Sequence, residues 1–257
     1  MGKLGKACVL LWVVILSVSL KAEEITVAAA SDLQFALTDL ADRFQKETGN
    51  SVKLTFGSSG NFFAQIQNGA PFDIFLSADV DYPHKLESAG LAEPGSLYEY
   101  ARGKIVIWVR ADSKLDLHRG IHALLDPSVG KIAIASPAHA PYGRAAVSAM
   151  QSAGVYQRVR DKLVLGENIS QTTSFVVAGS ADAGIIALSL ALAPGMKAKG
   201  RYAEIPAAAY PPIRQACVIL RSSQKKPIAR QFVAFMKRPA SSRLLQSYGF
   251  VVGVAQE

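Results

Sequence analysis

Cysteine is nearly absent from this 257-residue chain, which contains only Cys8 and Cys217. Cys8 lies in an N-terminal stretch that we expect to be removed, so no intramolecular disulfide is expected in the mature chain. Cys217 stands in an apolar, strand-like run at 216–220, where a free thiol behaves as a small hydrophobic side chain. The sequence therefore predicts a fold without disulfides and argues against a cysteine nucleophile.

Long hydrophobic runs are also scarce, and the one that is present lies at 7–20. Lys3 and Lys6 precede this run and Lys21 and Ala22 follow it, which is the pattern of a secretory signal peptide. The run is short for a membrane span. We therefore expect residues 1–22 to be a cleaved signal peptide and the protein to be periplasmic; an uncleaved anchor is the alternative.

Complete catalytic signatures are missing. The segment 57–61 is not a nucleophile elbow, because its second glycine comes one residue early. The segment 195–202 resembles a P-loop but has arginine and tyrosine where lysine and serine or threonine are required. His118 and His122 are four residues apart, but Gly120 between them favours a loop over a metal-binding helix. We therefore expect a protein that is not an enzyme and needs no cofactor.

Clusters of positive charge are absent as well, although the formal net charge is +8. The basic residues are spread along the chain and are not interleaved with aromatic residues, so no nucleic-acid partner is expected. Half of the chain is hydrophobic and 19% is charged, which is enough apolar material for a packed core.

What the chain does contain is a regular alternation of strand-like and helix-like segments. Such alternation predicts an α/β fold with mostly parallel sheets and right-handed crossovers. Strands are predicted at 25–30, 51–56, 72–76, 104–109, 131–135, 162–165, 183–187 and 216–220. Helices are predicted at 33–44, 61–69, 82–89, 143–152 and 170–178, with two more inside 227–248.

These segments form two sets, which indicates two lobes with a ligand cleft between them. We assign 23–102 and 213–257 to the first lobe and 103–212 to the second. The strand-like segments at 105–109 and 216–220 are expected to cross between the lobes. Such crossings would let the cleft open and close by a hinge motion.

Small residues and hydroxyl groups follow the predicted strands, at the edge where open α/β sheets bind ligands. They are Ser31, Ser58, Ser59, the segment 136–143, the segment 166–170 and Ala187. This set offers hydrogen-bond donors and helix starts but almost no cations, which suits an anion held by amides and hydroxyls. The simpler interpretation of Ser31 and Asp32 is a helix cap, because both residue types are common there.

Five segments carry a resemblance to a known family. They are ITVAAAS at 25–31, FGSS at 56–59, GAPFDIFLSAD at 69–79, GENI at 166–169 and YGF at 248–250. In order and spacing, the mature chain resembles the periplasmic molybdate-binding proteins of ABC transporters. The resemblance implies a two-lobed, type II-like periplasmic binding protein, expected to be monomeric, that delivers molybdate or tungstate to a membrane permease.

The resemblance also implies which residues bind the oxyanion. The family's two ligand serines correspond to Ser31 and Ser59, and its backbone donors correspond to Tyr142 and Ile169. Some members add a tyrosine hydroxyl at a position that is Ala187 here. The replacement donor is therefore open: the Tyr142 hydroxyl, if it does not point to solvent, or Ser189, with Ser58 as a further candidate.

A donor-only site favours a fully deprotonated dianion, because a protonated oxyanion would leave its own hydrogen unpaired. Asp73 and Asp79 are the carboxylates that could serve as acceptors, and we expect both to be structural, Asp73 at a strand start and Asp79 as a helix cap. Three alternatives stay open: a binding protein for another tetrahedral oxyanion such as sulfate, a ligand-sensing module of the same fold, and a hydrolase using Ser59.

Overall fold

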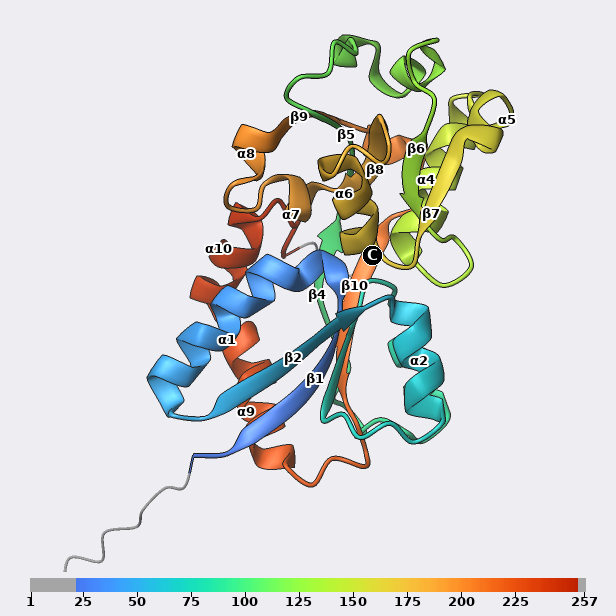
Figure 1. Ribbon diagram of the computed structural model, residues 1–257. Helices are drawn as coiled ribbons and strands as arrows, with labels where there is room; N and C mark the ends of the chain where they lie inside the picture. The colour runs from blue at the N-terminus through green and yellow to red at the C-terminus, as the bar shows by residue number, and fades with distance from the viewer. Residues whose placement is uncertain (1–21, 254–257) are drawn as a thin grey trace, which may run out of the picture.

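The computed structural model describes residues 22–253 and contains two five-stranded sheets, one at the bottom and one at the top of Figure 1. The predicted signal peptide, apart from Ala22, lies outside the described residues, as does Cys8. Within 22–253, no helix is long and apolar enough to cross a membrane.

The first sheet has the strand order β2-β1-β3-β10-β4. Its strands are β1 (Glu24–Ala30), β2 (Ser51–Gly57), β3 (Ile74–Ser77), β4 (Tyr98–Gly103) and β10 (Ile213–Ile219). Four strands run in one direction and β10 runs against them. The chain therefore returns to this sheet after building the second one.

Helices cover both faces of the first sheet because its strands bury alternate side chains on opposite faces. In β1, Val27 packs in a cluster with α1 (Gln34–Thr48), α9 (Lys226–Met236) and α10 (Pro239–Ser247), whereas Ala28 packs on the other side. That other face holds α2 (Ser59–Gln67) and α3 (Asp81–Ser88). Figure 1 shows α1 and α2 on opposite sides of the strands.

The second sheet has the order β7-β6-β8-β5-β9. Its strands are β5 (Ile105–Arg110), β6 (Ile132–Ala135), β7 (Leu163–Gly166), β8 (Ala183–Ala187) and β9 (Gly200–Glu204), with β5 antiparallel to its neighbours. Its helices are α4 (Pro141–Ser152), α5 (Tyr156–Val159), α6 (Ile169–Val177), α7 (Leu188–Ala191) and α8 (Met196–Lys199). The predicted two-lobed α/β fold with mostly parallel sheets is confirmed.

The chain changes sheet at two places. Lys104 alone separates β4 from β5, and the segment 205–212 separates β9 from β10. We expected the segments 105–109 and 216–220 to cross between the lobes, but 105–109 lies inside β5, and 216–220 lies in β10 except for its last residue. That expectation is wrong because each segment pairs with strands of a single sheet; the crossings come just before them.

Short 3₁₀ turns complete the fold: η1 (Ser31–Leu33), η2 (Leu117–Leu125), η3 (Arg160–Lys162) and η4 (Ala207–Ala209). The backbone of η2 leaves helical geometry at Gly120, so His118 and His122 do not share an α-helix. Cys217 is free and fully buried in β10, and this burial raises the pKa of its thiol to about 12. The prediction of a buried thiol is confirmed.

Candidate functional site

Four helix starts meet where the two sheets face each other. From the first lobe come η1, directly after β1, and α2, directly after β2; from the second come α4 and α6, after β6 and β7. The first amides of an α-helix have no partner within the helix, and the helix dipole adds partial positive charge there. The arrangement therefore directs donors from both lobes at one place.

Local sequence explains why these helices begin there. The Ser58 hydroxyl accepts a hydrogen bond from the amide of Asn61 and caps α2, and the Asn168 side chain accepts one from the amide of Gln171 and caps α6. Pro141 occupies the first turn of α4, where its missing N–H costs nothing. The cap predicted from Ser31 and Asp32 is wrong, because neither side chain caps η1 or α1.

A small hollow of about 190 Å³ lies between these helix starts. It is lined by Ala30, Ser31, Asp32, Gly57, Ser58, Ser59, Ala78, Ala140, Pro141, Tyr142 and Ile169. The structure thus brings together the four residues predicted to bind the oxyanion, and Ser58 with them. Ala187 and Ser189 are buried but do not line it.

Ser31 and Ser59 present their hydroxyls differently. Ser31 Oγ joins the lobes, because it donates to Asn168 Oδ1 (3.3 Å) and accepts from the amide of Ser170 (3.4 Å). Ser59 Oγ accepts a hydrogen bond from the amide of Ala78 (2.9 Å). A serine hydroxyl has one hydrogen besides its acceptor lone pairs, so Ser59 keeps its hydrogen for a ligand.

The sequence left open whether the Tyr142 hydroxyl binds the anion or points to solvent, and in the structure it does neither. The residue is buried, so the hydroxyl does not point to solvent. It donates to Asp32 Oδ2 at 2.8 Å and accepts from Gln215 Nε2 at 3.0 Å. Because a phenol has a single hydrogen to donate, what Tyr142 offers the hollow in this arrangement is its backbone amide.

Neither Ala187 nor Ser189 supplies a replacement donor. Ala187 ends β8 and is fully buried, with no hydroxyl to offer. Ser189 Oγ donates to the backbone carbonyl of Asp32 at 2.8 Å, so its hydrogen supports the η1 turn from α7. Neither residue reaches the lining of the hollow.

Asp32 is the lining residue that sequence reasoning missed. Its carboxylate is 1% exposed, and Oδ2 accepts hydrogen bonds from Tyr142 and from Gln215 Nε2 (2.6 Å). Oδ1 has no partner among the described residues. Burial raises the pKa of Asp32 to about 6, against the lowering effect of those hydrogen bonds and of the nearby backbone amides of Asp32 and Leu33. The available signal was an acid placed directly after the predicted ligand serine, between two apolar stretches.

Comparison with known proteins identifies the family. The profile of the bacterial extracellular solute-binding proteins matches residues 25–251. The chain belongs to this family. The molybdate-binding protein ModA of Azotobacter vinelandii is 36% identical over 247 residues, covering 96% of this chain and 97% of its own. ModA of Rhodobacter capsulatus is 37% identical over 230 residues, covering 90% and 89%.

A solved structure agrees with this assignment. The Azotobacter vinelandii periplasmic molybdate-binding protein superimposes with a TM-score of 0.85 at 34% identity, and the match covers 90% of this chain and all of that one. The sequence resemblance to periplasmic molybdate-binding proteins is therefore confirmed.

The other two carboxylates considered from the sequence lie outside the hollow of this solute-binding protein. Asp73 accepts hydrogen bonds from the amide of Thr26 (2.7 Å) and from Ser223 Oγ (2.6 Å), which ties β1 to the loop after β10. Asp79 accepts from the amide of Asp81 (2.9 Å) at the start of α3 and pairs with Arg144 of α4. Neither carboxylate lines the hollow, and Asp79 also links the lobes. The prediction of Asp79 as a helix cap is wrong, because Val80 is the N-cap of α3 and no side chain caps that helix.

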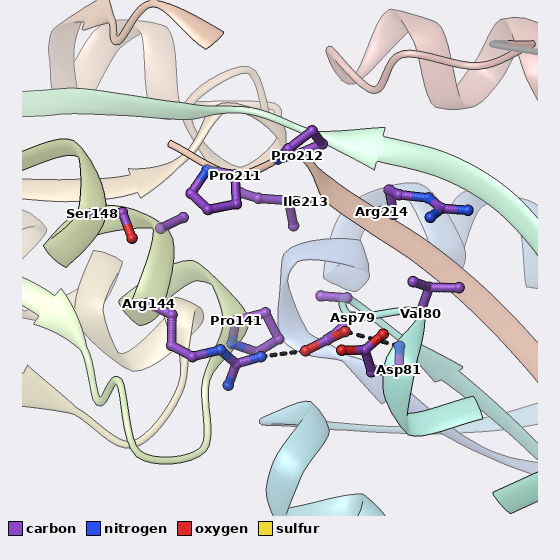
Figure 2. A pocket seen from close by; sticks show the side chains of 12 residues that line it. Asp79, Val80, Asp81, Pro141, Arg144, Ser148, Pro211, Pro212, Ile213 and Arg214 are labelled. Carbon is purple, nitrogen blue, oxygen red and sulfur yellow. Dashed lines mark hydrogen bonds and ion pairs between the residues drawn. The ribbon is translucent and has the colours of Figure 1, made fainter. Parts of the chain in front are cut away.

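A larger groove of about 860 Å³ lies beside the hollow and contains the Arg144–Asp79 pair (Figure 2). Both lobes and the second crossing line it, with Pro211, Pro212 and Arg214 on one side. Its arginines are paired with acids, Arg214 with Glu99 at 2.7 Å. The four residues predicted to bind the oxyanion line the smaller hollow and not this groove.

Resident metal chemistry has no support in the part of the chain that the structure describes. Residues 22–253 contain no cluster of three or more His, Cys, Asp or Glu side chains that could hold a metal ion. Ser59 would be the nucleophile in the hydrolase alternative. Its hydroxyl oxygen accepts a hydrogen bond from the amide of Ala78, and no hydrogen bond joins it to a base in the described part of the chain.

Proposed function

We propose that this solute-binding protein captures molybdate, or the similar anion tungstate, in the periplasm and delivers it to an ABC-type permease of the inner membrane. The oxyanion would be held by the hydroxyls of Ser31 and Ser59 and by the backbone amides of Tyr142 and Ile169. The protein would act as a monomer, without a cofactor and without catalysis.

The observation that carries this proposal is the composition of the hollow. Hydroxyls and helix-start amides from both lobes line it, and no Lys, Arg or His side chain does so among the described residues. A tetrahedral dianion needs several donors around it, and helix starts supply them with a favourable dipole. The hollow is narrow and is lined by hydroxyls, helix-start amides and small side chains, which suits a small inorganic anion better than an organic solute.

Family membership supports the transport role. Two relatives above 35% identity are molybdate-binding proteins, and the matched structure is a periplasmic one. A solute that binds between two lobes can lock them together, which gives a permease a loaded form to recognise. Sulfate and other tetrahedral oxyanions remain outcomes of the test below.

Calorimetric titration of the mature protein with molybdate, tungstate, sulfate and phosphate tests the proposal. We expect molybdate and tungstate to bind at least tenfold more tightly than the other two. Ser31→Ala and Ser59→Ala should each weaken molybdate binding ten- to hundredfold, because a hydrogen bond to a charged group is worth about 1.5–3 kcal/mol.

Ser148→Ala is the matched control, because that hydroxyl lies on α4 beside the larger groove and outside the lining of the hollow. It should keep wild-type affinity to within about twofold. Unchanged affinity in both Ser31→Ala and Ser59→Ala would show that the site lies elsewhere, and tighter binding of sulfate would replace molybdate as the ligand.

A further inference from the structure

We propose that Asp32 is a specificity residue of the oxyanion site and that the loaded site holds one proton, shared between Asp32 and the bound oxyanion. This inference rests on the proposed function and goes beyond it, because it states which proton content the site accepts. A site made only of donors would bind a fully deprotonated dianion. A buried acceptor in the same site allows one proton to be bound together with the oxyanion.

The geometry of Asp32 is the first step. Asp32 lines the hollow beside Ser31, and its side chain is buried. Tyr142 and Gln215 both donate to Oδ2, so that oxygen already has two partners. Oδ1 is buried and has no partner among the described residues. An unpaired buried carboxylate oxygen is costly, and a hydrogen placed between it and a ligand oxygen removes that cost.

Charge is the second step. An oxyanion in this hollow would put a second negative group beside Asp32 in a place with little water. Two negative groups that share a buried site do not both stay ionised; one of them takes a proton. If the oxyanion is a dianion, the proton resides on Asp32, which then donates to it. If the oxyanion carries a hydrogen, the ionised Asp32 accepts it.

No cation offsets this repulsion, because Asp32 makes no hydrogen bond or ion pair with Lys, Arg or His in the described part of the chain. The titratable groups that face it are two phenols, Tyr142 from α4 and, through Gln215 of β10, Tyr100 from β4. Burial raises the pKa of each phenol well above 10, so both stay neutral.

The elements that pack against η1 bring no free charge to it either. Neither α6 nor α7 contains a charged residue. The neighbouring charges on other elements have partners of their own: Arg144 with Asp79, Arg214 with Glu99, and Asp39 of α1 with the Tyr248 hydroxyl. Lys53 of β2 is exposed. The oxyanion and Asp32 are therefore the groups that share the proton.

The direction of the pH effect follows by linkage. Burial already raises the pKa of Asp32 to about 6 without a ligand, so at pH 7.5 the free carboxyl is mostly ionised. A bound dianion raises this pKa further, so binding takes up a proton. Affinity should then fall, by up to about tenfold per pH unit, as pH rises from about 6 toward the pKa of the loaded site.

Asp32→Asn separates this role from a purely structural one. The amide oxygen can keep accepting from Tyr142 and Gln215, while the amide nitrogen replaces Oδ1 and offers a donor to the hollow. The variant should therefore bind molybdate at least as tightly as wild type at pH 7.5. Its affinity should change less than about twofold between pH 6.5 and 8.5.

The deciding measurement is the number of protons taken up per anion bound, obtained by calorimetry at pH 7.5 in two buffers of different ionisation enthalpy, with no phosphate. Wild type should take up close to one proton per molybdate and Asp32→Asn close to none. Asp79→Asn, a carboxyl outside the hollow, should keep the wild-type proton count even if loss of its ion pair with Arg144 changes the affinity. Sulfate, which carries no proton at this pH, should give the same count if it binds and thereby places the proton on Asp32.

The outcomes separate the two proposals. Molybdate binding by wild type without proton uptake, or equal uptake by wild type and Asp32→Asn, overturns the role of Asp32 and leaves the oxyanion function standing. Failure of molybdate, tungstate and sulfate alike to bind overturns the proposed function and this inference with it. The wild-type proton count decides the question even if Asp32→Asn does not fold.

Discussion

At the scale of single residues, a hydroxyl serves an anion when its hydrogen is not committed to a short, buried hydrogen bond. The bond from Ser31 to Asn168 Oδ1 is 3.3 Å long and weak enough to be exchanged for a ligand. Ser59 meets this condition because its oxygen accepts from the amide of Ala78. Ser189 does not, because it donates to the Asp32 carbonyl, and neither does the Tyr142 hydroxyl, which donates to the Asp32 carboxylate. Counting hydroxyls in the sequence therefore overstates the donors available.

Tyr142→Phe tests this reasoning, because it removes the hydroxyl and keeps the ring and the amide. We expect molybdate affinity not to fall by more than about twofold. The free energy of unfolding should fall by about 1–2 kcal/mol, since a buried hydrogen bond to a carboxylate is lost. Calorimetry and urea unfolding measure the two quantities.

Tyr156→Phe, on the short helix α5 away from the hollow, is the control for removal of a phenol oxygen. It should leave affinity and stability as they are. A tenfold or larger loss of affinity in Tyr142→Phe alone would mean that the hydroxyl turns to the anion on binding.

At the scale of elements, much of the fold could be predicted because apolar runs mark the central strands. The strands and helices predicted from such runs lie within a few residues of their observed places. The strands β4 and β9 were missed because neither contains an apolar run, and β9 is largely exposed. The other two edge strands, β2 and β7, were predicted because each contains regularly placed apolar residues.

The site, like the fold, could be predicted in part from the sequence. Ser31, Ser59, Tyr142 and Ile169 follow predicted strands, so topology alone placed them at one edge. The burial of Asp32 depends on Tyr142 and Gln215, which lie 110 and 183 residues further along the chain. No local pattern contains that information.

Close packing of α4 on β6 fixes where the Tyr142 amide points. A Cβ at Gly143 would collide with the backbone carbonyl of Ala135 and lie 2.8 Å from the carbonyl carbon of Ser136. Gly143→Ala should push the start of α4 away from the sheet. We expect a loss of about 1–3 kcal/mol in unfolding free energy, as for overpacking, together with weaker molybdate binding.

Ser148→Ala, on the same helix and facing the groove of Figure 2, should change neither quantity. Urea unfolding and calorimetric titration of both variants check the pair. Wild-type affinity in a destabilised Gly143→Ala protein would show that α4 does not need this contact to place its amide.

At the scale of the whole molecule, the structure shows the lobes in contact around the hollow. Asn61 Nδ2 donates to Glu167 at 3.0 Å, the Ser170 hydroxyl donates to the Ser31 carbonyl at 3.0 Å, and Arg144 pairs with Asp79. Each contact joins the first sheet's lobe to the second's. Such polar contacts are individually weak, because exposed pairs are worth about 0–1 kcal/mol.

A bound oxyanion would add several donors from both lobes at once, and it would favour the closed arrangement by its differential affinity for that arrangement. The two crossings, Lys104 and 205–212, are the places where the backbone can bend.

We therefore expect a monomer that opens without ligand and compacts on binding. Small-angle scattering should show a smaller radius of gyration with saturating molybdate than without it. The control is Ser59→Ala at the same molybdate concentration, which is chosen to saturate wild type but to lie below the dissociation constant of the variant. This variant should stay open. Identical wild-type profiles with and without molybdate would contradict hinge closure.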